Sequence, residues 1–182
     1  MKDEQFKLAI QWLKSGGVIA YPTESVFGLG CDANNLKAIE RILKIKHRDS
    51  SKGLILLVSD IRQASQFIQP LNNESVSKLN MTLDQATTWL LPKASQTSRL
   101  ICGAHSKVAI RITKHPIARA LCHQLGSPIV STSCNLNGEP PYFQAGLIPA
   151  QLSTHLDLIL AGDCGGQAPS MIVDFISGEQ IR

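Results

Sequence analysis

Several common signatures are missing from this chain of 182 residues. The five cysteines include no C-x-x-C pair, and their odd number argues against a disulfide framework or a structural zinc site. No G-x-x-x-x-G-K-[ST] phosphate loop and no H-E-x-x-H metal motif occur. No apolar run approaches the roughly 20 residues that span a membrane. The sequence therefore predicts a protein of a reducing cytoplasm, with no membrane segment, no protein-bound metal and no P-loop.

Aromatic residues and unbalanced charge are also scarce. Aromatics make up 5% of the chain, too few for a platform that stacks single-stranded nucleic acid. The net charge of +4 permits an anionic partner but does not require one. Hydrophobic residues reach 43% and charged residues only 18%, which is typical of a globular protein. Residues 2–4 are charged and an amphipathic pattern follows, which is not the pattern of a signal peptide.

Helical and extended patterns alternate along the chain and predict one α/β domain over residues 1–182. The expected helices are 3–15, 35–46, a helix from Ser59-Asp60 to near Pro70, 73–90, 115–125 and 148–155. The expected strands are 18–21, 54–58, 108–112, 129–132, 158–161 and 171–175, with a loop at 136–147. Such elements form a mixed or mostly parallel sheet, and ligands of these sheets bind beyond the strand ends.

The first candidate site is a basic segment at a predicted junction between a helix and a strand. Its cations are Arg41, Lys44, Lys46, Arg48 and Lys52. The last three straddle the loop before the apolar run 54–58. Arginine grips phosphate with two parallel hydrogen bonds, and lysine adds a point charge. The segment predicts a phosphate site; the alternative is a solvated helix end whose cations answer the helix dipole.

The second candidate site is Ser131-Thr132-Ser133-Cys134-Asn135, directly after an apolar run. It offers three hydroxyls and an amide for a ligand, or alternatively forms a turn that caps a following helix. Cys134 is a poor candidate nucleophile because no histidine or acid lies nearby in sequence to activate it, so a packed thiol is expected. Together with the basic segment, these groups suit a polyanion such as a nucleoside triphosphate.

A third segment, residues 21–32, contains Gly28-x-Gly30 and several hydroxyls after a predicted strand. This is only a fragment of the dinucleotide fingerprint. It lacks the third glycine in frame and the acidic residue that follows in the right context. A Rossmann-type site is therefore not supported.

Four motifs occur in an order that resembles the YrdC/TsaC family, the threonylcarbamoyl-AMP synthases. They are Tyr-Pro-Thr-Glu-Ser-Val-Phe-Gly-Leu-Gly-Cys-Asp (21–32), Lys-x-Arg (46–48), Ser-x-Asn (133–135) and Pro-Ser-Met-Ile-Val-Asp (169–174). The similarity runs from about residue 7 to the C-terminus, and the length resembles the short single-domain bacterial form. The resemblance implies a twisted open mixed sheet with flanking helices and a concave basic cavity.

The resemblance also implies a reaction. L-threonine and bicarbonate give a carbamate on the amine, which attacks the α-phosphate of ATP and releases pyrophosphate. Mg2+ is expected to assist, and partner proteins then pass the threonylcarbamoyl group to an adenosine of tRNA. Two alternatives stay open. One is a double-stranded RNA-binding or ribosome-maturation module without catalysis. The other is a carbamoyl-transfer domain of hydrogenase maturation, whose usual cysteine pairs are absent here.

By this resemblance, residue roles can be assigned. Lys46 and Arg48 would be catalytic. The nucleotide site would comprise Lys46, Arg48, Lys52, Ser133, Asn135 and Arg182. The threonine site would comprise Thr23, Ser25, Arg111 and Ser131. Phe27 stands where relatives usually carry Tyr, Leu57 where longer relatives carry His, and Lys52 where many carry Asn, so the details of the threonine pocket stay open.

Overall fold

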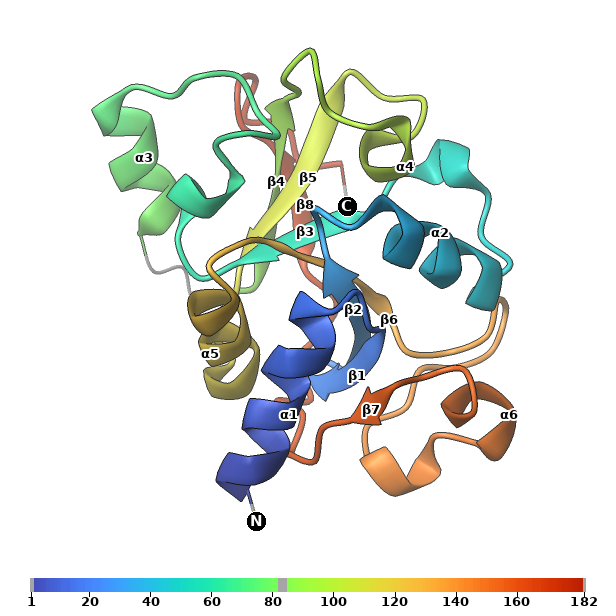
Figure 1. Cartoon of the computed structure of the whole chain (residues 1–182). Helices are drawn as coiled ribbons and strands as arrows, with labels where there is room; N and C mark the ends of the chain where they lie inside the picture. The colour runs from blue at the N-terminus through green and yellow to red at the C-terminus, as the bar shows by residue number, and fades with distance from the viewer. Residues whose placement is uncertain (1, 82–84, 182) are drawn as a thin grey trace.

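A computed structural model describes residues 2–81 and 85–181, and the strands within these ranges form one mixed eight-stranded sheet (Figure 1). The spatial order is β7-β1-β2-β6-β3-β5-β4-β8. The strands are β1 (Ile19–Pro22), β2 (Phe27–Asp32), β3 (Ile55–Val58), β4 (Thr87–Pro92), β5 (Lys107–Ile112), β6 (Ile129–Ser133), β7 (Leu158–Ile159) and β8 (Met171–Asp174). The pairs β1/β7, β3/β5 and β4/β8 are parallel and the other four are antiparallel. The predicted mixed sheet is confirmed.

One helix precedes the first strand and shorter helices lie between later strands. The helices are α1 (Lys2–Lys14), α2 (Leu36–Ile45), α3 (Asn73–Asn80), α4 (Arg99–Cys102), α5 (Pro116–Leu125) and α6 (Ala150–Ser153). The side chain of Asn35 caps α2 by accepting from the backbone N–H of Ala38 at 3.0 Å. Gly126, with φ of 77°, ends α5 in the left-handed conformation that glycine adopts without strain. None of the helices described is long and apolar enough to cross a membrane.

The helices cover the two faces of the sheet unequally. On one face α1 and α5 lie side by side (Figure 1) and bury Ile19, Tyr21, Leu57 and Ile129. On the other face a larger cluster packs against α2, α4 and neighbouring loops. Side chains alternate along each strand, so the register places Arg111 on the same face as Leu57. The part of this face that α1 and α5 do not cover is hollowed into a cavity, which Arg111, Ser131 and Ser133 line.

One predicted helix is wrong, a second is correct only in its first part, and two strands, β2 and β4, were missed. Residues 73–90 are helical only to Asn80, and β4 begins at Thr87, where threonines and a tryptophan favour a pleated surface. The helix expected from Ser59-Asp60 to Pro70 is a single tight turn at 61–64. The strand β2 was missed because Gly28 and Gly30 dilute its hydrophobic pattern.

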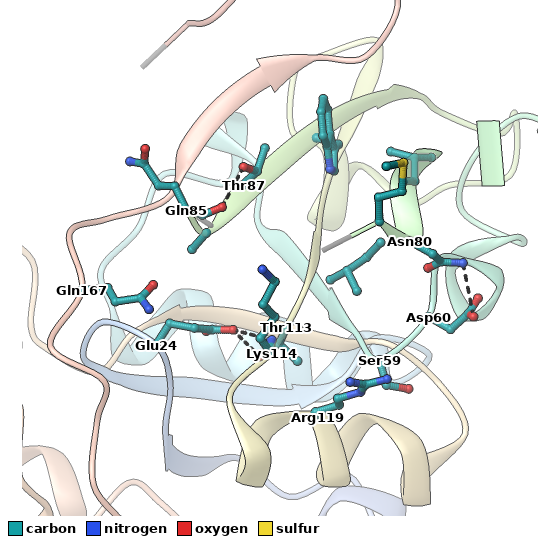
Figure 2. A pocket seen from close by; sticks show the side chains of 15 residues that line it. Glu24, Ser59, Asp60, Asn80, Gln85, Thr87, Thr113, Lys114, Arg119 and Gln167 are labelled. Atoms are coloured by element: carbon teal, nitrogen blue, oxygen red, sulfur yellow. Dashed lines mark hydrogen bonds between the residues drawn. The ribbon is translucent and has the colours of Figure 1, made fainter. Parts of the chain in front are cut away.

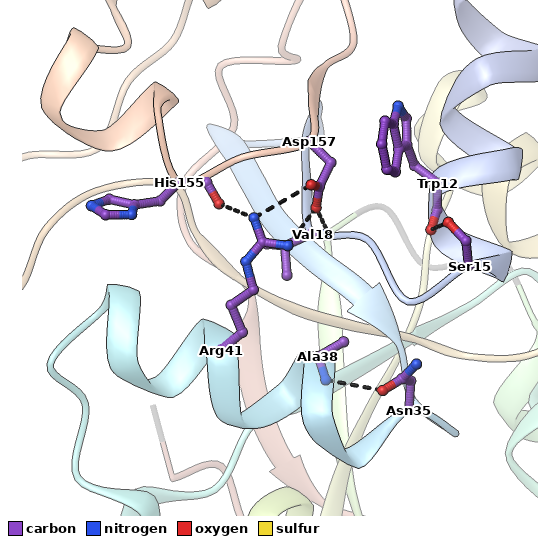
Figure 3. A network of polar contacts seen from close by, with 8 residues as sticks. All are labelled: Trp12, Ser15, Val18, Asn35, Ala38, Arg41, His155 and Asp157. Carbon is purple, nitrogen blue, oxygen red and sulfur yellow. Dashed lines mark hydrogen bonds and ion pairs between the residues drawn. The ribbon is translucent and has the colours of Figure 1, made fainter.

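A polar network ties α2 to the chain before β7 (Figure 3). The guanidinium of Arg41 donates to Asp157 Oδ2 at 2.6 Å and to the carbonyl of His155 at 2.6 Å. The same carboxylate accepts from the backbone N–H of Val18 at 2.7 Å. Arg41 therefore contributes to the fold, and it does not line the cavities that Lys46, Arg48 and Lys52 line, although it belongs to the same basic segment.

Candidate functional site

The predicted site residues line two adjoining cavities on the open half of the sheet. The larger has a volume of about 460 Å³ and the smaller about 230 Å³. Of the predicted residues, the larger cavity holds Thr23, Ser25, Arg48, Lys52, Arg111, Ser131 and Ser133. The smaller holds Lys46, Arg48, Lys52, Ser133 and Asn135. Arg48, Lys52 and Ser133 line both, so the two cavities meet at these side chains. Arg182 lies outside the described residues.

The turn that ends α2 directs Lys46 and Arg48 into the site. His47 has φ of 45°, the only positive φ among the non-glycine residues described. The backbone N–H of Arg48 donates to the carbonyl of Leu43 at 3.0 Å, and that of His47 to Lys44 at 3.1 Å. This is the Schellman arrangement, usually completed by glycine. A histidine in this position carries backbone strain, which is more common at functional sites.

Lys46 joins the two predicted halves of the site directly. Its ammonium donates to the carbonyl of Ser133 at 2.7 Å, to the carbonyl of Asn135 at 2.6 Å and to Asn135 Oδ1 at 2.7 Å. An ammonium has three protons, so these partners use all of them. Burial lowers the pKa of Lys46 to about 8. Lys46 thus positions the Ser-x-Asn segment, and its predicted contact with phosphate stays a prediction.

Arg48 is held by a loop that only glycine can form. Its Nε and one terminal nitrogen donate to the carbonyl of Gly53 at 3.3 and 2.9 Å. Gly53 has φ of 63° and ψ of 176°, a conformation essentially restricted to glycine. A Cβ there would lie 3.1 Å from the carbonyl oxygens of Ile101 and Cys102. The half-buried guanidinium is therefore fixed in the wall between the two cavities; burial lowers its pKa, yet arginine stays charged.

Arg111 is anchored at the other end of the larger cavity. Its Nε donates to Thr88 Oγ1 at 3.1 Å, and a terminal nitrogen donates to Ser170 Oγ at 2.6 Å. The two hydroxyls lie 2.8 Å apart and are buried. The sequence analysis missed both as site residues. Ser170 lies in the motif at 169–174, which offered a signal, whereas Thr88 fell in a segment predicted as helix.

The ring of Tyr21 lies close to both glycines of β2. A Cβ added at Gly28 would lie 3.0 Å from Thr23 Cγ2 and 3.2 Å from Tyr21 Cζ, and one at Gly30 would clash with the carbonyl oxygen of Val130 and lie 3.0 Å from Tyr21 Cε1. The buried phenol donates to Ser131 Oγ at 2.8 Å. Burial raises its pKa, so the hydroxyl stays protonated and remains a donor. Gly28-x-Gly30 therefore makes room for an aromatic ring that orients a site serine.

Thr23 shapes the turn that brings Ser25 to the cavity. Its hydroxyl donates to the carbonyl of Val26 at 2.6 Å and accepts from the backbone N–H of Ser25 at 3.3 Å. Phe27 and Leu57, which depart from the family pattern, are both fully buried in hydrophobic clusters. Because Thr23 uses its hydroxyl within the turn, Ser25 is the better placed of the two hydroxyls for a ligand.

Cys134 is not a nucleophile in this arrangement. Its side chain is fully buried, and burial raises the pKa of the thiol to about 12. A thiol in that state is almost entirely protonated at neutral pH. The prediction of a packed cysteine is confirmed.

These features define an α/β protein with an open mixed sheet and adjoining cavities lined by Lys46, Arg48, Lys52 and Arg111. The family model Sua5_yciO_yrdC, described as "Telomere recombination", matches residues 11–182. The chain belongs to the Sua5/YciO/YrdC family. The threonylcarbamoyl-AMP synthase of Nitrosococcus oceani is 42% identical over 177 residues, which cover 97% of this chain and 96% of the relative.

Two solved structures share the fold. The crystal structure of P. abyssi Sua5 complexed with L-threonine has a TM-score of 0.83 and 25% identity, over 96% of this chain and 52% of that one. E. coli YciO has a TM-score of 0.77 and 29% identity, over 94% of this chain and 84% of its own. The chain thus spans about half the length of P. abyssi Sua5 but nearly all of the Nitrosococcus oceani synthase.

Proposed function

We propose that this chain is a threonylcarbamoyl-AMP synthase, which converts L-threonine, bicarbonate and ATP to threonylcarbamoyl-adenylate and pyrophosphate. One observation carries the proposal: Arg48 and Arg111 line the same cavity with the hydroxyls of Ser131 and Ser133. The reaction needs two fixed cations, one for phosphate and one for the carboxylate of the amino acid. The curated relatives of nearly equal length, which bear the same enzyme name, support it.

The Arg111 end of the cavity suits the amino acid. A guanidinium binds a carboxylate through parallel charge-assisted hydrogen bonds, and Thr88 and Ser170 fix its orientation before substrate arrives. Ser25 and Ser131 then offer hydroxyls for the substrate's amine or side chain. The amine attacks the carbon of bicarbonate, water leaves, and a carbamate is formed on threonine.

The Arg48 end suits the nucleotide. A carbamate oxygen attacks the α-phosphorus of ATP, the bond to the bridging oxygen breaks, and pyrophosphate leaves. The protein contributes alignment and neutralisation of charge rather than a covalent intermediate. Arg48 and Lys52 supply fixed positive charge, while Ser133 and Asn135, held by Lys46, would contact the nucleotide.

Mg2+ belongs to the proposal as a partner of the ATP phosphates. Within the described ranges no three His, Cys, Asp or Glu side chains are grouped so as to hold a metal ion. Phosphate oxygens and water would therefore supply the ligands, as is usual for Mg2+ with nucleotides. A cytoplasmic location, transfer to tRNA by partner proteins and contact with tRNA or double-stranded RNA complete the proposal.

The test is an assay of pyrophosphate release with each substrate omitted in turn. We expect release only when threonine, bicarbonate and ATP are all present, with threonylcarbamoyl-adenylate detected by mass spectrometry. Well-folded protein that releases no pyrophosphate from the full mixture contradicts the proposal. In that case RNA binding that weakens steeply with salt and ignores threonine would favour the binding module.

A further inference from the structure

Glu24 is a buried carboxylate next to the site that the proposed reaction does not use. It lies between Thr23 and Ser25, which line the substrate cavity, yet its own side chain lines a different cavity of about 170 Å³ (Figure 2). Glu24 is only 7% exposed. Charged residues are rarely this buried unless they are paired or strongly hydrogen-bonded, so its surroundings need an explanation.

One carboxylate oxygen gathers three donors from the end of β5 and the start of α5. Glu24 Oε1 accepts from the hydroxyl of Thr113 at 2.7 Å and from the backbone N–H groups of Lys114 at 2.8 Å and His115 at 3.2 Å. Figure 2 shows the contacts of Glu24 with Thr113 and Lys114. His115 precedes α5 and has no side-chain capping bond, and Pro116 brings no N–H. A carboxylate from a distant segment therefore binds the turn directly before α5, near the positive end of the helix dipole.

The contacts keep Glu24 ionised at some cost. Burial opposes ionisation, but the hydrogen bonds from Thr113, Lys114 and His115 outweigh it, and the pKa of Glu24 is lowered. Its second oxygen, Oε2, is buried and has no hydrogen-bond partner among the described residues. A buried polar atom without a partner destabilises the fold. Stability alone therefore does not account for a glutamate here.

The position of the Glu24 contacts relative to the sheet points to the role of this residue. The turn at 23–26 leads into β2, whereas Arg111 belongs to β5, and β6 and β3 lie between these two strands. Strand pairing thus does not set the distance between Ser25 and Arg111 directly. Thr113 follows Arg111 by two residues, so the bond from Thr113 to Glu24 links the two segments across the end of the sheet.

A second set of bonds fastens the chain that leads to Ser170. The carbonyl of Glu24 accepts from the backbone N–H of Gln167 at 2.9 Å, and that of Thr23 accepts from Gly165 at 3.0 Å. Ser170, three residues after Gln167, bonds Arg111. The segments that carry Ser25, Arg111 and Ser170 therefore all meet at Glu24.

We propose that Glu24 is a positioning residue for the amino-acid end of the cavity: its carboxylate fixes the separation between Ser25 and the Arg111–Ser170 pair. The inference rests on the proposed function, because threonine is the ligand that the pair would hold. Glu24 touches no substrate. It acts through the backbone of two segments, so its loss should weaken the binding of threonine without affecting the binding of ATP.

The test compares Glu24→Gln with the exposed control Glu40→Gln in the pyrophosphate assay. Glutamine has nearly the same shape but no charge, and we expect the KM for threonine to rise about tenfold while the KM for ATP is unchanged. Thr113→Val should raise the threonine KM by a smaller factor, and the effects of the two changes should not add in the double variant, because both changes weaken the same contact. Glu40→Gln should change neither constant.

An unchanged threonine KM in Glu24→Gln overturns the inference. If kcat then falls in proportion to the folded fraction measured by circular dichroism, with both KM values unchanged, the role of Glu24 is purely structural. If the wild type releases no pyrophosphate, the proposed function fails separately. Calorimetry with threonine then tests the role of Glu24. Weaker binding of threonine to Glu24→Gln than to wild type supports this role, and equal binding to both, or no binding to either, rejects it.

Discussion

The ammonium of Lys46 lies 2.7 Å from the side-chain oxygen of Asn135, 89 positions further along the chain. The contact is buried and joins the end of α2 to the loop after β6. It ties the Lys-x-Arg motif to the Ser-x-Asn motif, the two segments of the proposed nucleotide site. A ligand that binds either segment therefore depends on the same lysine.

Lys46→Met should weaken the binding of ATP and remove the pH dependence of ATP affinity. With a pKa of about 8, Lys46 is charged in free protein below that pH and neutral above it. A triphosphate nearby favours the charged form. ATP affinity should thus fall as the pH rises through 8, and binding at pH about 8.5 should take up protons. Calorimetry in two buffers of different ionisation enthalpy measures the uptake. Equal uptake by wild type and Lys46→Met would contradict this assignment.

Arg48→Ala should lower kcat by at least about a hundredfold, because it removes a fixed charge from the phosphate end of the cavity. The melting temperature should change little. Arg41→Ala is the matched control from the same segment. It breaks the contact with Asp157 (Figure 3), so it should cost about 1 kcal/mol of unfolding free energy and leave kcat per folded molecule unchanged. Unchanged kinetics in Arg48→Ala would remove Arg48 from the site.

Gly53→Ala should impair both stability and the nucleotide site. The backbone conformation at Gly53 is strained for any other residue, so the change should cost about 1–3 kcal/mol. Relief of that strain would move the carbonyl that holds Arg48 and raise the KM for ATP. Urea unfolding and steady-state kinetics measure the two effects. Gly126→Ala is the control, since Gly126 also has a positive φ, has nothing within 4 Å of an added Cβ and does not line either cavity of the site; it should lose stability only.

Tyr21→Phe should act on threonine rather than on ATP. The change removes one hydroxyl and leaves Ser131 Oγ without its buried donor, at a cost of about 1 kcal/mol. The ring still fills the space over Gly28 and Gly30, so the sheet should keep its form. We expect a several-fold rise in the threonine KM alone. An equal rise for both substrates would show a general loss of geometry instead.

The sequence predicted the parts of the site that are contiguous in the chain. The Lys-x-Arg and Ser-x-Asn motifs lie where the family resemblance put them, and the structure brings them together. Their partners were not predictable in the same way. Thr88 joins Arg111 through strand pairing, and Glu24 meets Thr113 across 89 positions. Such contacts arise from packing between segments far apart in sequence, which no local pattern records.

The secondary structure shows the same division. Helices with clear periodicity, such as α1 and α5, lie close to their predicted bounds. The strand β2 was missed because of its two glycines, which make room for the Tyr21 ring and for the backbone of β6, a reason visible only in three dimensions. Residues 87–90 were predicted as helix because the hydrophobic pattern of α3 was extended too far, past Asn80.

Tyr21 belongs to two parts of the molecule at once. Its ring is packed in the cluster beneath α1 and α5, together with Leu13 and Leu121, while its hydroxyl belongs to the site. The packing of this hydrophobic cluster therefore fixes the position of the hydroxyl that orients Ser131 in the proposed threonine site. A substitution such as Leu13→Ala, far from any ligand, would let the ring shift. Looser packing of the cluster should therefore lower the affinity for the amino acid under conditions in which the sheet is still folded.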